Sequence, residues 1–572
     1  MSHTRSGLAL TVLALAALLC GCGGSSTSSV LATTPTPTPT ASTPATTATT
    51  SLAGAVTVTG RVTYHHLELI GPTDNPTVST TVRPVRCADV VALGASGADI
   101  ELAPAATADD GTFTLLVPPN STFKVGVVSS TSHSGTRAHL EVRDPADQKL
   151  YTVAMGDDAG GAFFTGASGS PVSVTLPSLA AHPSSRRPAG IFNILDAALT
   201  SSDMARAHRG SPLPILTLYW SPTSTEGSYF LPTAGPNSGA AIFVRGGNSD
   251  ADDTDEFDDA VLEHEYGHFI IETDSRDSSL GGGHTLGTAN YAALAFNEGL
   301  ASFLSILARG KPLYEDAAGI TGPAPTQFTL DPEGGRPQSE IHGIHCEETV
   351  LEVLWDLADG AEGRPDTDAD GVALTGDVLY AALKSLATRE HTVTLIEYLN
   401  ALVASGAIST ATVQTLLLHP ENQHVSFPAT GDDVSPRPVS LPVSLTDACV
   451  TRTEADNAET GADSTNRFFT FSLPSAAPVT VRLSLLNGAA GTNDSGTNLN
   501  LYLLTPSNLF VKDTSHNTLT ADPRPEGATE TVSGTLPAGD YVVWVMGWPD
   551  GGGKQLNRQS HSVPFRLEVT SP

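Results

Sequence analysis

The order of apolar and polar residues changes twice along the chain, and the first pattern is that of short strands. Apolar residues alternate with polar ones in Val56–Tyr64, Gly111–Pro118 and Phe123–Val128, and turn-forming residues separate these runs. Strict alternation places one set of side chains on each face of a sheet. We therefore expect a small β-sandwich over residues 55–182.

The second pattern, over residues 183–430, has the period of a helix. Apolar residues recur every three or four positions, which is the spacing of one buried helix face. Two apolar runs, Pro214–Trp220 and Ala240–Val244, predict strands instead. We expect a mainly helical α+β domain with helices over residues 191–207, 257–272, 291–308, 347–358, 377–388 and 394–403.

Strand-like alternation returns after a Pro-containing linker at residues 431–443. The runs Arg467–Phe471, Val479–Leu483, Leu499–Leu504 and Gly539–Val545 predict strands of a second β-sandwich over residues 444–572. The predicted fold class is therefore multidomain, with a helical α+β domain flanked by two β-sandwich domains.

Composition argues against two classes of function, nucleic-acid binding and transport across a membrane by spanning helices. The 572 residues include 61 acidic and 29 basic side chains, which leaves a formal net charge of −32 at pH 7. A surface this negative repels a phosphate backbone, so we expect no nucleic-acid partner. No segment after the N-terminus has about 18 uninterrupted apolar residues, so no membrane-spanning helix is expected.

The first residues have the pattern of an export signal. Arg5 precedes an apolar stretch over residues 8–19 that is too short to span a bilayer, and small residues follow it. The segment Leu19-Cys20-Gly21-Cys22 resembles the bacterial lipobox. This resemblance implies a signal peptide over residues 1–21, a lipid on Cys22 and a Ser/Thr/Pro-rich tether over residues 22–54. We expect an extracytoplasmic protein. It is either anchored by that lipid to the bacterial cell envelope, with the outer membrane favoured, or secreted. The alternative to a lipobox is an ordinary signal peptide that is cleaved nearby.

Cleavage before Cys22 and its acylation would leave three cysteines for the folded chain, which are Cys87, Cys346 and Cys449. Their wide spacing resembles no metal-binding cluster. An oxidising compartment permits one disulfide and one remaining thiol. The sequence assigns no pair.

One motif in the helical region carries chemistry. In His264-Glu265-Tyr266-Gly267-His268 the two histidines lie about one helical turn apart, so both imidazoles project from one face and can bind one Zn²⁺. Zinc lowers the pKa of a coordinated water to about 7. Glu265 lies beside the histidines, where it can act as the general base. The motif predicts a zinc peptidase; a helix with two partly exposed histidines is the alternative.

A catalytic zinc normally has three protein ligands. The segment Asn297-Glu298-Gly299 follows on the next predicted helix, and its N-E-G-x-A pattern resembles that of the gluzincins, which include thermolysin-like and fungalysin-like peptidases and zinc aminopeptidases. The resemblance covers residues 240–360 and implies Glu298 as the third ligand, ahead of Asp274 and His284. It also implies that the strand Ala240–Val244 is the sheet edge that pairs with an extended substrate.

The same resemblance suggests further roles around the metal. Ser302 stands where thermolysin-like chains carry an Asp, and its hydroxyl can orient a zinc-bound histidine. His342 and His345 lie where such chains place a donor for the oxyanion of the tetrahedral intermediate, and Tyr291 is another candidate. An ordinary surface or capping role is the alternative for each of the last three.

The flanking sandwiches also resemble known modules. The D-G-x-F-x-L-x-V-P strand that ends at Pro118 resembles the regulatory domain of carboxypeptidases, which has a transthyretin-like fold. The N-L-N-L-Y-L strand and the segment Leu536–Val543 resemble the bacterial pre-peptidase C-terminal domain, which is appended to many secreted proteases. An adhesive β-sandwich is the alternative for this tail.

Two acidic runs have features of calcium sites. Asp366, Asp368 and Asp370, with Asp377 at the twelfth position, match the spacing of a calcium loop, and a solvated loop is the alternative. Residues 250–259 include seven acids just before the motif helix, which could cap that helix, lie in solvent or bind calcium.

Together these features predict a lipid-anchored zinc metallopeptidase with a peptide or protein substrate, an endopeptidase being favoured. Its membrane contact would be through the N-terminal lipid only. A surface-binding lipoprotein with a structural or lapsed zinc site is the first alternative. A zinc aminopeptidase is the second, although the chain has no G-x-M-E-N-like segment for holding a substrate amine.

Overall fold

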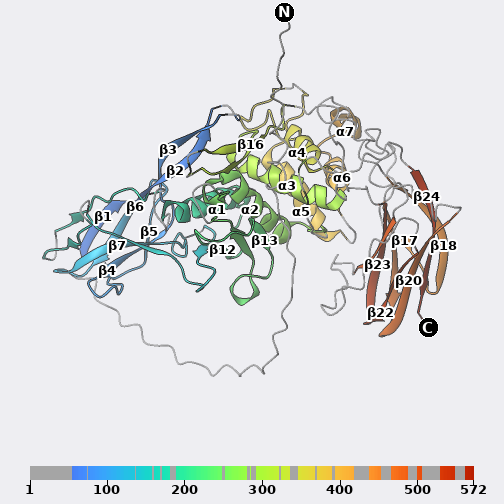
Figure 1. Cartoon of the computed structure of the whole chain (residues 1–572), viewed down its shortest axis with the longest axis horizontal. Helices are drawn as coiled ribbons and strands as arrows, with labels where there is room; N and C mark the ends of the chain where they lie inside the picture. The colour runs from blue at the N-terminus through green and yellow to red at the C-terminus, as the bar shows by residue number, and fades with distance from the viewer. Residues whose placement is uncertain are drawn as a thin grey trace, which may run out of the picture.

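The structure is a computed structural model of the whole chain, in which N-terminal strands, central helices and C-terminal strands form three groups (Figure 1). It describes residues 54–71, 73, 75–135, 137–157, 160–167, 170–180, 188–247, 252–279, 284, 286, 292–320, 322, 324–334, 346–367, 370–389, 393–417, 437–451, 466–486, 499–504, 529–547 and 561–571. The expected signal peptide and nearly all of the tether lie outside these residues. Among the helices described here, none combines the length and the apolar character needed to cross a bilayer.

Two sheets build the N-terminal region and share one core. The strands are β1 (Val56–Arg61), β4 (Asp89–Gly94), β5 (Ala105–Ala106), β6 (Thr112–Val117), β7 (Thr122–Val128), β9 (Thr152–Met155), β10 (Phe163–Phe164) and β11 (Val172–Ser173). β1 pairs with β6 and β11, and the other strands form the second sheet. Buried and exposed side chains alternate in β6, as the period of two predicts. Val58, Leu115, Val90 and Val125 bring both sheets into one apolar cluster.

A four-stranded sheet in the middle of the molecule combines strands from two predicted domains. Its order is β13 (Tyr229–Leu231), β14 (Ala241–Val244), β12 (Leu216–Trp220) and β8 (Leu140–Arg143). β8 and β14 run parallel to β12, and β13 runs antiparallel to β14. The sheets therefore do not divide at the expected boundary between residues 182 and 183, because β8 pairs with a strand of the helical region.

The same sheet corrects the expected position of its edge. The strand Ala240–Val244 was expected at the edge, but β14 lies between β12 and β13. The chain turns back after β12 and adds β13, which is the edge strand on this side of the described sheet. The three residues of β13 are too few to show an alternating pattern, so the sequence did not reveal it.

The helices of this region carry the candidate site. They are α1 (Pro188–Arg209), α2 (Asp259–Asp274), α3 (Ala292–Arg309), α4 (Glu347–Asp356), α5 (Gly376–Ser385), α6 (Leu395–Ser405) and α7 (Thr410–Leu417), with 3₁₀ turns η1 (Pro236–Ser238), η2 (Asp255–Phe257) and η3 (Leu386–Thr388). The antiparallel pair β15 (Tyr314–Ala318) and β16 (Thr326–Leu330) follows α3. Nearly every residue of α2 is buried, which places this helix at the centre of the group.

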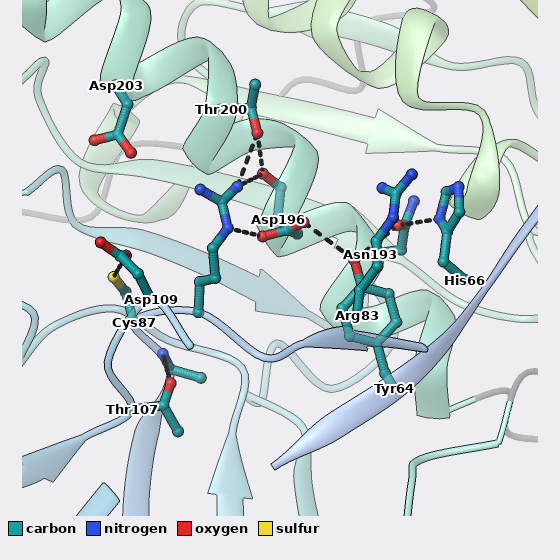
Figure 2. A network of polar contacts seen from close by, with 12 residues as sticks. Tyr64, His66, Arg83, Cys87, Thr107, Asp109, Asn193, Asp196, Thr200 and Asp203 are labelled. Carbon is teal, nitrogen blue, oxygen red and sulfur yellow. Dashed lines mark hydrogen bonds and ion pairs between the residues drawn. The ribbon is translucent and has the colours of Figure 1, made fainter. Parts of the chain in front are cut away.

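A buried polar network joins the N-terminal region to α1 (Figure 2). It starts on a two-stranded sheet made of β2 (Thr63–Ile70) and β3 (Thr77–Pro84). The Tyr64 hydroxyl donates to Asn193 Oδ1 and Asp196 Oδ2, both at 3.1 Å, and His66 Nδ1 lies 2.8 Å from the same Asn193 oxygen. Arg86 forms an ion pair with Asp196 and donates to Thr200 Oγ1 at 2.8 Å.

The described residues of the C-terminal region form two four-stranded sheets with a core of their own. One sheet has the order β17 (Arg437–Pro438), β19 (Asn466–Leu473), β23 (Gly539–Gly547) and β21 (Leu499–Leu504). The other has the order β18 (Val443–Thr451), β24 (His561–Thr570), β20 (Ala477–Leu485) and β22 (Glu530–Leu536). Phe469, Val543, Val481 and Leu567 are buried in one apolar cluster that contains no residue of the other two regions.

Candidate metal centre

Two histidines of α2 present their imidazoles to the same point. His264 and His268 are one helical turn apart, and their Nε2 atoms lie 3.1 Å from each other. Each residue is 7% exposed. The polar ring atoms are thus buried, which is uncommon for histidines without a partner.

Glu298 of α3 completes a group of three. Its Oε2 lies 3.2 Å from His264 Nε2 and 3.1 Å from His268 Nε2. One ligand atom from each of the three residues lies within 4.8 Å of the others. The structure therefore brings together the three side chains that the sequence suggested as metal ligands.

Two glycines permit this close approach. A Cβ on Gly267 would lie 2.9 Å from Ala301 Cα, so the glycine lets α2 pack directly against α3. A Cβ on Gly299 would lie 2.6 Å from the Glu347 carbonyl oxygen, so the glycine next to Glu298 lets α3 pack against α4. The spacing of the candidate ligands thus depends on two residues that have no side chain.

The second ring nitrogen of each histidine also has a neighbour. His264 Nδ1 lies 2.9 Å from Ser302 Oγ, and His268 Nδ1 lies 3.2 Å from Asn297 Nδ2. Partners at Nδ1 fix the ring orientation and leave Nε2 for a metal. The sequence predicts the orienting hydroxyl of Ser302. It does not predict the contact of Asn297, which belongs to the N-E-G pattern.

Opposite charges face one another in this group. Burial alone would raise the pKa of Glu298, but His268 and His284 lower it well below its usual range. Burial alone would lower the pKa of His268, but Glu298 raises it to about 9. A buried set of two imidazoles and one carboxylate matches the donors of a His₂Glu zinc site, so the residues present fit this ion.

Glu265 is buried on α2 between the two histidines and is 2% exposed. Its negative charge contributes to the raised pKa of His268, which places its carboxylate within electrostatic reach of the candidate centre. It does not belong to the group of three ligand atoms. Its position suits a proton acceptor rather than a ligand.

Asp274 and His284, the two alternative candidates for the third ligand, do not belong to the group of three ligand atoms. Asp274 accepts hydrogen bonds from Arg209 Nε at 2.9 Å and from the Tyr380 hydroxyl at 2.8 Å, so it is bound at the end of α2. His284 Nε2 lies 3.6 Å from Glu298 Oε1, and its Nδ1 lies 3.0 Å from Glu347 Oε2. His284 thus contacts Glu298 on the oxygen that does not face the other histidines.

Several predicted residues lie outside the described part of the chain or apart from one another. His342, His345, Tyr291, Asp368 and Cys22 belong to segments that the structure does not describe. Asp370 Oδ1 accepts from the Val372 N–H at 2.7 Å, and Asp377 Oδ1 lies 2.7 Å from His208 Nδ1. Asp366, Asp370 and Asp377 form no metal-binding group among the described residues.

The cysteines give no disulfide within the described residues. Cys87 and Cys346 are both buried thiols. Cys346 Sγ lies 2.8 Å from Glu348 Oε2. The side chain of Cys449 lies outside the description, so any pairing that involves it remains a prediction.

Comparison with known proteins gives distant structural similarities only. No protein-family profile and no curated protein matches the chain. A pre-peptidase C-terminal domain of a collagenase from Bacillus anthracis is 12% identical, with coverage of 24% of this chain and 94% of that chain and a TM-score of 0.15. The precursor of protealysin, a metalloproteinase from Serratia proteamaculans, is 10% identical, with coverage of 50% of this chain and 88% of that chain and a TM-score of 0.27. Similarities this weak carry no argument, so function must be argued from the geometry of the centre.

Proposed function

We propose that this protein is a zinc metallopeptidase of the gluzincin type. The observation that carries the proposal is the convergence of His264, His268 and Glu298 within 4.8 Å, with Glu265 on the same helix. His264, His268 and Glu298 would hold the ion. Zinc in such a site supplies a Lewis acid that polarises a carbonyl and lowers the pKa of a coordinated water to about 7.

The chain itself supplies the proton transfers and the substrate alignment. Glu265 takes a proton from the attacking water and returns it to the leaving amine. An extended peptide adds to the antiparallel edge strand β13, since a sheet edge offers unpaired backbone groups. The candidate hydrogen-bond donors to the oxyanion are His342, His345 and Tyr291.

The proposal is tested by measuring zinc content and peptide hydrolysis in matched variants. Glu265→Gln keeps full zinc and loses at least about 100-fold in turnover, because the ligands remain and the base is gone. Glu298→Ala loses both. Glu272→Gln, an exposed residue of the same helix, is the control and changes neither. Full zinc and activity in Glu298→Ala would overturn the assignment.

The same experiment separates the two alternative functions. A surface-binding lipoprotein with a structural zinc site would bind zinc but hydrolyse no member of a peptide library. An aminopeptidase would release only N-terminal residues and would not cleave peptides with an acetylated N-terminus. Internal cleavage of blocked peptides is the result expected for an endopeptidase.

Membrane attachment through Cys22 is a separate proposal. The lipobox-like sequence supports it, because acylation of a cysteine after small residues anchors exported bacterial lipoproteins. Cys22→Ser should release the protein from the membrane fraction into the soluble fraction. Unchanged, detergent-dependent partitioning of Cys22→Ser would argue against acylation.

A further inference from the structure

Glu298 has a further neighbour besides the two histidines of α2. Its Oε2 atom faces His264 and His268, whereas its Oε1 atom lies 3.6 Å from His284 Nε2. On the other side of the His284 ring, Nδ1 lies 3.0 Å from Glu347 Oε2. Glu347, His284 and Glu298 therefore form a row that ends at the candidate metal centre.

All three members of this row are buried. The side chains of His284, Glu298 and Glu347 are 2%, 7% and 6% exposed. Ionisable side chains are rarely buried this deeply unless they have polar or charged partners. An imidazole between two carboxylates has such a partner on each side, and the two contacts together fix the orientation of its ring.

The first turn of α4 gives the row a rigid base. Glu347 is the first residue of this helix, where the backbone N–H groups favour a negative charge. The α3 backbone next to Glu298 rests on the same turn, because a Cβ on Gly299 would lie 2.6 Å from the Glu347 carbonyl oxygen. The packing of α3 against α4 therefore sets the position of Glu347 relative to Glu298.

The Nε2 atom of His284 is buried and has no hydrogen-bond partner among the described residues. Buried polar atoms in native proteins nearly always have a partner. The group that this nitrogen faces, in an ion-pair contact, is the Glu298 carboxylate. The contact uses the oxygen of Glu298 that does not face the histidines of α2.

With this contact, each of the three candidate ligands has a polar neighbour behind it. Ser302 lies beside His264 Nδ1, and Asn297 lies beside His268 Nδ1. Contacts of this kind orient a metal ligand, and their loss typically costs about 10–100-fold in metal affinity. A glutamate side chain has more rotatable bonds than a histidine, so it gains more order from such a contact.

We propose that His284 is a positioning residue that holds Glu298 in its metal-binding orientation, and that Glu347 in turn holds His284. This inference rests on the proposed function, since it takes His264, His268 and Glu298 as the zinc ligands. His284 acts on the other oxygen of Glu298 and is not itself a ligand. A purely structural link between α3 and α4 is the alternative that the test must separate.

The test compares the zinc affinity of full-chain variants, measured by competition with a chromogenic chelator at a temperature where each metal-free variant is folded. His284→Ala lowers the affinity about 10–100-fold, because Glu298 loses its orienting partner. His284→Gln recovers part of this loss, because its amide N–H can donate to Glu298 as the imidazole Nε2 does. Glu347→Ala gives a smaller loss than His284→Ala, because the imidazole remains.

A spectroscopic measurement separates positioning from a general loss of stability. Cobalt(II), used in place of zinc, has visible absorption bands that depend on the arrangement of its ligands, and these bands shift in His284→Ala. The control is His66→Ala, which removes another buried histidine, in the network of Figure 2. It lowers the melting temperature of the metal-free chain but leaves the cobalt bands and the zinc affinity unchanged. If His284→Ala fails to fold, His284→Leu, which fills more of the space without a polar atom, replaces it.

Failure of this inference differs from failure of the proposed function. A wild-type chain that binds no zinc, or a Glu298→Ala variant that keeps full zinc, overturns both. Loss of zinc in Glu298→Ala, with wild-type affinity and cobalt bands in His284→Ala, overturns only the role of His284. Zinc loss as complete in His284→Ala as in Glu298→Ala would make His284 a ligand instead. A loss no larger than that of His66→Ala, or no recovery in His284→Gln, would leave His284 as a structural residue.

Discussion

The two β-rich regions flank the helices in sequence, yet within the described residues only the N-terminal one shares a core with them. Apolar side chains from β1 to α7 form one continuous cluster, whereas those of the C-terminal strands form another. β8 of the N-terminal region is a strand of the central sheet. Similar patterns of alternation thus led to an integral part of the unit that contains α2 in one case and to a separate unit in the other.

Polar contacts show the same difference. Asn193 of α1 receives the Tyr64 hydroxyl on its oxygen and donates from Nδ2 to Asp259 Oδ1 of α2 at 2.8 Å. The Arg83 guanidinium of β3 reaches the other oxygen of Asp259 at 3.0 Å. The N-terminal region therefore contacts the first turn of the helix that carries His264 and His268. In the C-terminal region Asp447 pairs with Arg467 of the same region, at 3.5 Å.

Removal of residues 54–180 should have the largest effect on the unit that contains α2. It takes away β8, the partner of β12, and exposes the face of α1 that the hairpin β2–β3 covers. We expect an insoluble or unfolded product that binds no zinc, measured by circular dichroism and metal analysis. A soluble fragment of residues 183–430 that binds one zinc would show that the N-terminal region is dispensable.

A single change at the network should lower stability substantially. Asp196→Ala leaves the Arg86 guanidinium, whose side chain is 22% exposed, without its carboxylate. Loss of one partner of a buried ion pair costs about 3 kcal/mol of unfolding free energy. Urea unfolding of the unit that contains α2 measures this loss of unfolding free energy.

The control for Asp196→Ala is Asp109→Ala, which removes a carboxylate that is paired with Arg137 but 65% exposed. An exposed pair contributes less than about 1 kcal/mol. Equal losses of unfolding free energy in the two variants would mean that the ion pair between Arg86 and Asp196 of α1 stabilises the unit no more than an exposed ion pair does.

Tyr64→Phe should give a smaller loss of about 1 kcal/mol. The hydroxyl is removed, but the acceptors keep other partners, since Asp196 pairs with Arg86 and the Asn193 oxygen contacts His66. The ring remains, so the apolar packing of this fully buried side chain is unchanged. The same urea experiment checks the value, and a loss as large as that of Asp196→Ala would contradict the graded order.

Much of this organisation could be predicted from local pattern. The motif helix, predicted over residues 257–272, is α2 at Asp259–Asp274, because its apolar residues recur with the helical period. Glu298 could be proposed because its N-E-G-x-A pattern resembles that of the gluzincins. The structure adds that the neighbouring Gly299 allows the contact with α4. Both signals lie within a few residues of the feature that they predict.

The features that the sequence did not reveal depend on contacts between distant residues. Tyr64 and Asn193 are 129 positions apart, and neither lies in a motif. β8 has four residues and β13 has three, too few for a periodic pattern, so their pairing follows from the tertiary arrangement. His284 contacts Glu298 and Glu347, but nothing near Glu347 in the sequence indicates that contact.

Removal of the C-terminal region should have the smallest effect on the unit that contains α2. A chain that ends at residue 436 lacks both C-terminal sheets, but every candidate zinc ligand precedes that point and the lost core is separate. We expect a change of less than about 0.5 kcal/mol in the unfolding free energy of the unit that contains α2, and the proposed zinc binding and hydrolysis should be retained. In the full chain, Leu567→Ala is the matched test, because it creates a cavity in the C-terminal core and should lower the stability of that unit alone by about 2–5 kcal/mol. Calorimetry would then show the C-terminal transition move while the other stays in place. Loss of zinc from a folded, truncated chain, or a joint shift of both transitions in Leu567→Ala, would show that the two regions depend on each other after all.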